Sequence, residues 1–264
     1  MISEQQLGVS TLTWKSWPIT DSIRRAHELG FTLVDLGLIK RMGTGIDPLM
    51  LIEDLDACLA PVEAALADTG IGVASFNARL HGDATTWRDQ AEALARAARR
   101  LGVISGITLG NGPVDAGLHT VVEDLRMPCA VLQEHGITPM VESHRNQFTE
   151  DIGRTAALLE ALPDLQLTLD ASHYISQGLQ PDDWEVLLPR VRHAHLRPCD
   201  AEQLCVPVTA EGPGTAAWLR RCADRGYTGT ITHERMGPDP EENESETIAH
   251  RAALRAAGCL HPFG

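Results

Sequence analysis

The chain alternates short apolar runs with longer segments of helical periodicity. In the run LQLTLD, leucines at positions 165, 167 and 169 alternate with polar residues and are followed by Asp170. Alternation with a period of two predicts a strand, and the terminal aspartate places a polar group at the edge of a core. Comparable runs predict eight strands, at 7–14, 31–38, 71–78, 103–109, 137–142, 165–170, 191–196 and 228–234.

Segments of helical character follow the predicted strands, and several end at a glycine. Thr20 and Thr149 are expected to cap two of these helices. Eight strands that each precede a helical segment predict a (β/α)₈ TIM barrel. A doubly wound open sheet is disfavoured because no GxGxxG motif follows the first strand. We find no linker or low-complexity tract, so a single domain over residues 1–264 is predicted.

Composition fits this architecture and narrows the class of function. The length of 264 residues suits one barrel, and 43% hydrophobic residues indicate a globular protein. A formal net charge of -14 argues against nucleic acid or anionic lipid as a partner. The six cysteines form no CxxC pair, which disfavours a zinc knuckle or a disulfide framework. With neither a long apolar segment nor a secretion signal, we expect a cytoplasmic protein without a membrane partner.

Three carboxylates and one imidazole stand where the later predicted strands end. These strands deliver, in order, Glu142, Asp170, His195 and Glu234. The carboxyl ends of barrel strands share one rim, so side chains far apart in sequence can converge there. Unpaired carboxylates at that spacing would repel and raise one another's pKa values, and a shared divalent cation would keep them ionised.

The mixture of oxygen ligands with one nitrogen suggests which ion this site would hold. We expect one divalent metal ion, Mn²⁺ first, with Mg²⁺, Co²⁺, Zn²⁺ and Fe²⁺ as alternatives. Four protein ligands would leave about two positions of a six-coordinate ion open. A hydroxy-ketone could bind there through two oxygens, with its carbonyl polarised by the metal.

Five short motifs carry a family resemblance. They are TPMVESH, LTLDASHY, RHAHLRP, EGPG and GTITHE, and GFTLVDLGL resembles the second strand of the same family. In this order they resemble the xylose isomerase-like superfamily, in particular its sugar phosphate isomerase/epimerase branch, which includes the ketose 3-epimerases. The resemblance covers nearly the whole chain and implies a TIM barrel acting on a small sugar-like molecule, with a homodimer as the expected assembly.

The same resemblance implies roles for individual residues. It implies that Glu142, Asp170, His195 and Glu234 hold the metal, with Glu142 and Glu234 also acting as acid and base on opposite faces of the substrate carbon. His173 resembles the family histidine that contacts a substrate oxygen, and Arg197 resembles a substrate-contacting basic group. The reaction implied is proton abstraction and return through a metal-stabilised enediolate, by an isomerase or epimerase of sugars or sugar-derived hydroxy-carbonyl compounds.

Three alternatives stay open at this point. A lyase or dehydratase of the same fold would share the first proton transfer and then expel a substituent. An endonuclease IV-like nuclease is a remote alternative, because the loop LCVPVTAEGPG lacks the Asp-x-His that its extra metals need. A non-catalytic barrel is disfavoured because all four ligand positions are present.

Several further side chains are candidates with competing structural interpretations. Trp14 could wall a sugar-sized pocket, and Asn146 could donate a hydrogen bond to substrate, as could Asn77. His193 shares a strand face with His195 and is interpreted as a supporting or core histidine rather than a ligand. The remaining candidates are His81, which could reach the rim, Trp17, which could line the pocket with Trp14, and His144 and His233, for which packing or loop roles are expected.

Overall fold

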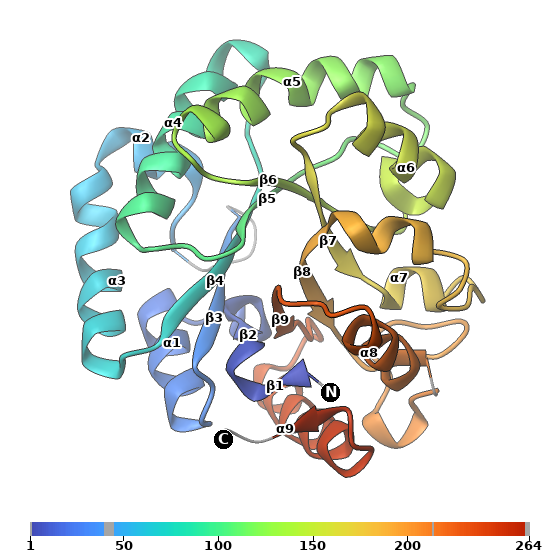
Figure 1. Ribbon diagram of the computed structural model, residues 1–264. Helices are drawn as coiled ribbons and strands as arrows, with labels where there is room; N and C mark the ends of the chain where they lie inside the picture. The colour runs from blue at the N-terminus through green and yellow to red at the C-terminus, as the bar shows by residue number, and fades with distance from the viewer. Residues whose placement is uncertain (1, 40–44, 213, 262–264) are drawn as a thin grey trace.

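The computed structural model describes residues 2–39, 45–212 and 214–261, and within them eight parallel strands close into a barrel (Figure 1). The strands are hydrogen-bonded in chain order, with β9 returning to β2. The barrel strands are β2 (Leu7–Ser10), β3 (Leu33–Leu38), β4 (Gly72–Ala78), β5 (Gly106–Leu109), β6 (Pro139–Glu142), β7 (Gln166–Asp170), β8 (Val191–Leu196) and β9 (Thr230–His233). The TIM barrel predicted from the sequence is confirmed.

Helices connect successive strands and surround the barrel, as Figure 1 shows. The longer ones are α1 (Ile19–Glu28), α3 (Leu55–Thr69), α4 (Ala84–Arg100), α5 (Leu118–Glu134), α6 (Ile152–Ala161), α8 (Gly214–Asp224) and α9 (Pro240–Ala256). Two short helices, α2 (Pro48–Glu53) and α7 (Ser172–Ile175), and several 3-10 turns complete the connections. The stretch after β7 contains one helical turn, α7, and the 3-10 helix Glu185–Arg190.

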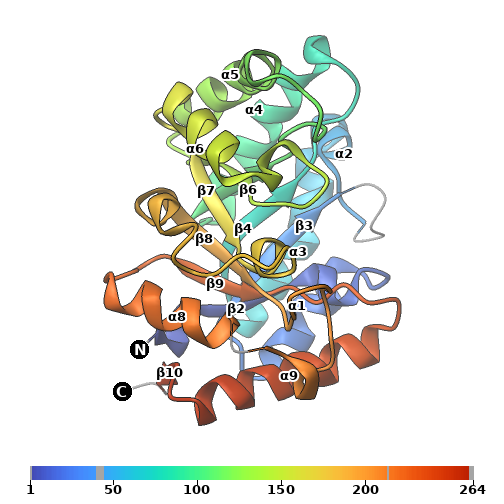
Figure 2. The same ribbon diagram turned by 90° about the vertical axis from the view of Figure 1, so that its right-hand side faces the viewer.

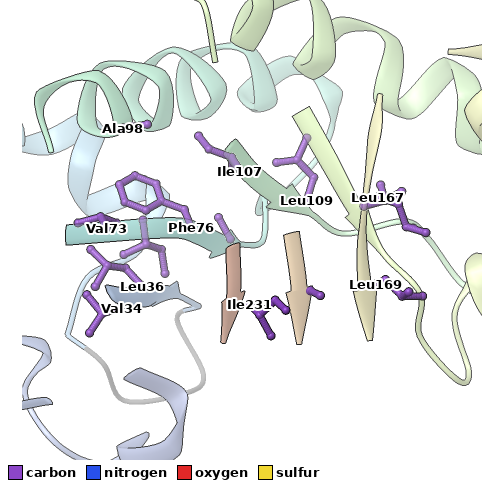
Figure 3. Close-up of a cluster of buried hydrophobic side chains, with 14 of the residues drawn as sticks. Val34, Leu36, Val73, Phe76, Ala98, Ile107, Leu109, Leu167, Leu169 and Ile231 are labelled. Atoms are coloured by element: carbon purple, nitrogen blue, oxygen red, sulfur yellow. The ribbon is translucent and has the colours of Figure 1, made fainter. Parts of the chain in front are cut away.

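The outward faces of the strands form the apolar core with the helices. Val34 and Leu36 of β3, Phe76 of β4 and Leu167 and Leu169 of β7 are all buried (Figure 3). Alternation along each strand sends the intervening side chains into the barrel. Because the apolar side chains pack outward against the helices, the side chains between them point into the barrel.

The interior of the barrel is unusually polar. Thr108 of β5 hydrogen-bonds Thr168 of β7 at 2.7 Å, and Ser105 bonds Thr230 of β9 at 2.7 Å, although neither pair belongs to neighbouring strands. Such contacts can only run across the inside. Branched apolar residues dominate most barrel interiors. Here hydrogen-bonded hydroxyl groups fill part of the interior, below the charged residues at the rim.

Several boundaries differ from the sequence prediction for local reasons. The strand predicted over 7–14 ends at Ser10, whose hydroxyl accepts the Leu12 N–H and starts a 3-10 helix. The cap predicted at Thr20 is replaced by Pro18. Thr149 lies in a 3-10 turn, and Asp151 caps α6 through the Arg154 N–H.

The two ends of the described chain lie side by side, which the sequence did not predict. Strand β1 (Ile2–Ser3) pairs in parallel with β10 (Leu260–His261) outside the barrel (Figures 1 and 2). Among the described residues, no helix combines the length and apolarity needed to cross a bilayer. The homodimer and the cytoplasmic location stay predictions.

Candidate active site

Four side chains meet at the carboxyl-terminal rim of the barrel. Glu142 is the last residue of β6, Asp170 is the last of β7, His195 lies one residue before the end of β8, and Glu234 directly follows β9. Each offers a ligand atom, and these atoms all lie within 4.8 Å of one another. The structure thus brings together the four residues that the sequence pattern singled out across 92 positions.

The His195 imidazole is at the centre of this group. Its Nδ1 lies 2.7 Å from Glu142 Oε1 and 3.4 Å from Glu234 Oε2, and its Nε2 lies 3.6 Å from Asp35 Oδ2. Burial acts to lower the pKa of His195, but the charges of Glu234 and Glu142 outweigh it and raise the pKa well above its ordinary value. The ring therefore faces carboxylates on both of its nitrogen edges.

Arg197 lies inside the same group. Its side chain is only 4% exposed, and Nη2 lies 2.5 Å from Asp170 Oδ2 and 2.6 Å from Glu234 Oε2. A buried guanidinium between two carboxylates neutralises part of their charge. The substrate contact predicted for Arg197 stays a prediction, because its described contacts are with these two carboxylates.

The sequence DASH explains how Asp170 is held. Ser172, at the start of α7, donates its backbone N–H to Asp170 Oδ1 at 3.0 Å and its hydroxyl to the same oxygen. Ser143 accepts the Asp170 N–H at 2.9 Å and donates to the Asp170 carbonyl at 3.0 Å. One carboxylate oxygen is thus anchored, and Oδ2 is left facing the rim.

The pKa values of the two glutamates are shifted in opposite directions. Burial by itself would raise the pKa of Glu142, but the charge and hydrogen bond of His195 lower it to about 2. Burial raises the pKa of Glu234 to about 7, with His195 opposing the shift and the charge of Glu142 adding to it. Environments that separate the pKa values of two carboxyl groups are typical of a base working with an acid.

The residues at the rim fit a divalent cation. Four buried or largely buried carboxylates, those of Asp35, Glu142, Asp170 and Glu234, face one guanidinium and one imidazole. With all four carboxylates ionised, two negative charges are left over even when the imidazole is protonated, and within the described chain Asp170 Oδ2 faces only the Arg197 guanidinium and His173 Nε2. Oxygen ligands with one nitrogen suit Mg²⁺ or Mn²⁺. The identity of the metal stays a proposal.

A cavity of about 420 Å³ opens beside this group. Its lining comes from the loops after β6, β7 and β8: His144, Arg145, Asn146, His173, Arg197, Gln203 and Leu204. His173 Nε2 lies 3.5 Å from Asp170 Oδ2, and burial, followed by the Arg197 charge, lowers the pKa of His173 to about 2. A neutral His173 and an exposed Asn146 therefore face the space where the sequence predicted substrate contacts.

Of three further side chains that the sequence suggested for the substrate site, only Asn77 contacts one of the four rim residues. Trp14 is fully buried, stacks on Trp17 and donates its indole N–H to Glu244 of α9 at 2.9 Å, so its contacts belong to helix packing and not to this cavity. His81 donates its backbone N–H to Gln90. Asn77 does reach the rim, where its amide donates to Glu234 Oε1 at 3.3 Å.

The other three histidines also have distinct places. His193 lies within 2.7 Å of the Thr230 hydroxyl and 3.2 Å of that of Thr232, in the polar interior below His195. His144 packs against His173, with 4.1 Å between ring centroids and a tilt of 36° between the rings, and it lines the cavity. His233 packs against Phe31 and His250.

Asp35 is the site residue that sequence reasoning missed. It lies in the middle of β3, is fully buried, and accepts a hydrogen bond from the Ser75 hydroxyl at 2.5 Å. Its other oxygen faces His195 Nε2 at 3.6 Å. The sequence did contain a sign of this residue, the single aspartate in the apolar run FTLVDLGL. A carboxylate in a buried strand needs a partner, so its presence there indicates a buried polar site.

Replacing Asp35 by asparagine is expected to weaken binding of Mn²⁺ by about 10–100-fold, since a carboxylate behind a ligand histidine fixes the ring and its tautomer. Titration calorimetry on the intact protein measures this affinity. The matched control is Ser105→Ala, which removes a buried polar contact to Thr230 away from the rim and should leave the affinity within about twofold. Equal affinity in wild type and Asp35→Asn would contradict the role given to Asp35.

The chain matches a known protein family over most of its length. The sequence profile described as "Xylose isomerase-like TIM barrel" matches residues 23–256. Among curated proteins, 79 residues are 30% identical to a 3-dehydroshikimate dehydratase of Bacillus anthracis, covering 29% of this chain and 28% of that enzyme.

Solved structures with the same fold include proteins of different activity. A probable 3-DHS dehydratase, AsbF of Bacillus anthracis, has a TM-score of 0.74 at 18% identity, covering 94% of this chain and 97% of that one. A D-allulose 3-epimerase of Methylomonas has a TM-score of 0.73 at 15% identity, covering 96% and 97%. A xylose isomerase-like barrel of Mycobacterium smegmatis in complex with magnesium has a TM-score of 0.69 at 17% identity, covering 96% and 100%. At these identities the likeness establishes the fold.

Proposed function

We propose that this chain, which belongs to the xylose isomerase-like TIM barrel family, is a metal-dependent isomerase or epimerase of a sugar or sugar-derived hydroxy-carbonyl compound. The observation that carries the proposal is geometric: Glu142 and Glu234 both face the His195 imidazole, within a group of four possible metal ligands at the rim of the barrel. Proton removal beside a carbonyl needs one group ionised and another able to carry a proton.

Glu142, Asp170, His195 and Glu234 are the residues that would hold the cation. When bound, a divalent metal polarises a carbonyl oxygen as a Lewis acid. Glu142, which its lowered pKa keeps ionised, is the group assigned to take the proton from the carbon beside the carbonyl. Glu234, with its pKa near neutrality, is assigned to return a proton, and the Asn77 amide orients its Oε1. Return to the opposite face of the same carbon inverts it, and return to the neighbouring carbon gives isomerisation.

A dehydratase is the second candidate function. The specific observation in its favour is the 30% identity over 79 residues with a 3-dehydroshikimate dehydratase. Glu142 would remove the same kind of proton, and Glu234 would then protonate a departing hydroxyl group instead of carbon. The acid and base assignments are therefore common to both candidates, and only the fate of the second proton differs.

A panel of compounds in D₂O with Mn²⁺ tests the proposal. It would include ketoses such as D-fructose, aldoses, their phosphates, and 3-dehydroshikimate, each followed by NMR spectroscopy and mass spectrometry. Deuterium uptake at carbon without loss of water supports an isomerase or epimerase, and loss of water supports the dehydratase. If no compound exchanges deuterium or loses water with the metal-loaded protein, both are wrong.

A further inference from the structure

The cavity beside the rim has an unusual chemistry for an acidic protein. The residues that line it include two arginines, two histidines and two side-chain amides, and none of the described lining residues is acidic. The chain as a whole carries 36 acidic residues against 22 basic ones. A basic lining within an acidic protein focuses a local field that attracts anions.

The two arginines of the cavity differ in whether their charge is paired. Arg197 is neutralised by Asp170 and Glu234. Arg145 is not paired in this way, because no carboxylate of the described chain lies within salt-bridge distance of its guanidinium. Its Nη1 contacts only the Ser176 hydroxyl at 3.3 Å and the Glu202 carbonyl at 3.4 Å. These neutral acceptors hold the guanidinium in place and leave its charge and most of its donors for another partner.

The loop that carries Arg145 is fixed on both sides. The Arg145 N–H donates to His173 Nδ1 at 3.2 Å, which ties the loop to the side chain next to Asp170. Asn146 adopts a left-handed conformation with φ of 61°, and its N–H donates to Glu150 Oε2 at 2.6 Å, which ties the loop to the 3-10 helix Phe148–Glu150. Asparagine tolerates this conformation better than most residues. Arg145 is thus held beside a cavity whose lining includes His173 and Arg197, and both of these side chains contact Asp170.

We propose that the substrate carries an anionic group, a carboxylate or a phosphate, at the end remote from its hydroxy-carbonyl group, and that Arg145 binds it. This inference rests on the proposed function, since it places the hydroxy-carbonyl end at Glu142 and Glu234. The cavity, at about 420 Å³, is within the size range of small-molecule sites. A guanidinium fork matches both carboxylate and phosphate geometry.

Three ketoses that differ only at carbon 6 test the inference: D-fructose, D-fructuronate and D-fructose 6-phosphate. Binding to the Mn²⁺-loaded protein is measured by calorimetry, and deuterium uptake is measured in parallel. We expect at least one of the two anions to bind tenfold or more tightly than D-fructose, and the preferred anion identifies carboxylate or phosphate. In Arg145→Gln its Kd should rise tenfold or more. The control Arg126→Gln, which makes the same charge change on the exposed face of α5, should leave it within about twofold.

The outcomes separate the inference from the proposed function. Equal binding of all three ketoses, or equal effects of Arg145→Gln and Arg126→Gln, overturns the anion site even if D-fructose exchanges deuterium. Binding of an anion that depends on Arg145, without deuterium uptake from any compound of the panel, supports the anion site and overturns the proposed reaction.

Discussion

Replacing Glu142 by glutamine is expected to lower deuterium uptake into the accepted substrate by about 10²–10⁴-fold, the range contributed by a positioned acid or base. Glutamine keeps the size of the side chain but cannot accept the proton. Glu234→Gln should lose product formation to a similar extent. In an epimerase, however, the proton facing Glu142 should still exchange into the starting compound without inversion of the carbon. The measurement is NMR-detected exchange together with product analysis.

Loss of metal would imitate loss of a base, so Mn²⁺ affinity is measured in the same variants. The matched control is Glu160→Gln on the exposed surface of α6, which should exchange at the wild-type rate. The acid and base roles are wrong if Glu142→Gln binds Mn²⁺ and exchanges deuterium at the wild-type rate, or if Glu234→Gln binds Mn²⁺ and forms product at the wild-type rate.

The barrel and its rim could be predicted because both follow from local patterns. Alternation in β7 and β8 places Asp170 and His195 on the inward face, and the closed order of strands then brings them opposite one another in register. The positions of Glu142 and Glu234 follow from the same rule.

The parts that could not be predicted depend on contacts between distant segments. Asp35 faces His195 across the barrel, and a single aspartate within an apolar strand does not reveal which residue lies opposite. Arg197 could be placed near the rim but its ion pairs could not be foreseen. Trp14 was misplaced because the predicted strand 7–14 turns into a 3-10 helix after Ser10, which directs the indole to Glu244 of α9.

Such tertiary contacts also decide how charge is balanced at the site. Asp170 and Glu234 are each no more than 1% exposed, and the Arg197 guanidinium lies between them. A buried carboxylate left without a partner is strongly destabilising, whereas a buried ion pair as a whole adds little. Arg197 and a divalent cation would therefore both compensate the same negative charges.

Arg197→Met is expected to destabilise the metal-free protein by about 3–5 kcal/mol, the usual effect of breaking a buried ion pair. Thermal unfolding should show the midpoint falling by about 2–4 °C for each kcal/mol. Saturating Mn²⁺ should then raise the midpoint more in Arg197→Met than in wild type, because the cation neutralises carboxylates that have lost their guanidinium. Arg225→Met, which breaks an exposed pair with Glu185, should cost less than about 1 kcal/mol, with the same Mn²⁺ shift as wild type. An Arg197→Met protein with wild-type stability and a wild-type Mn²⁺ shift would contradict the shared compensation of charge at the rim.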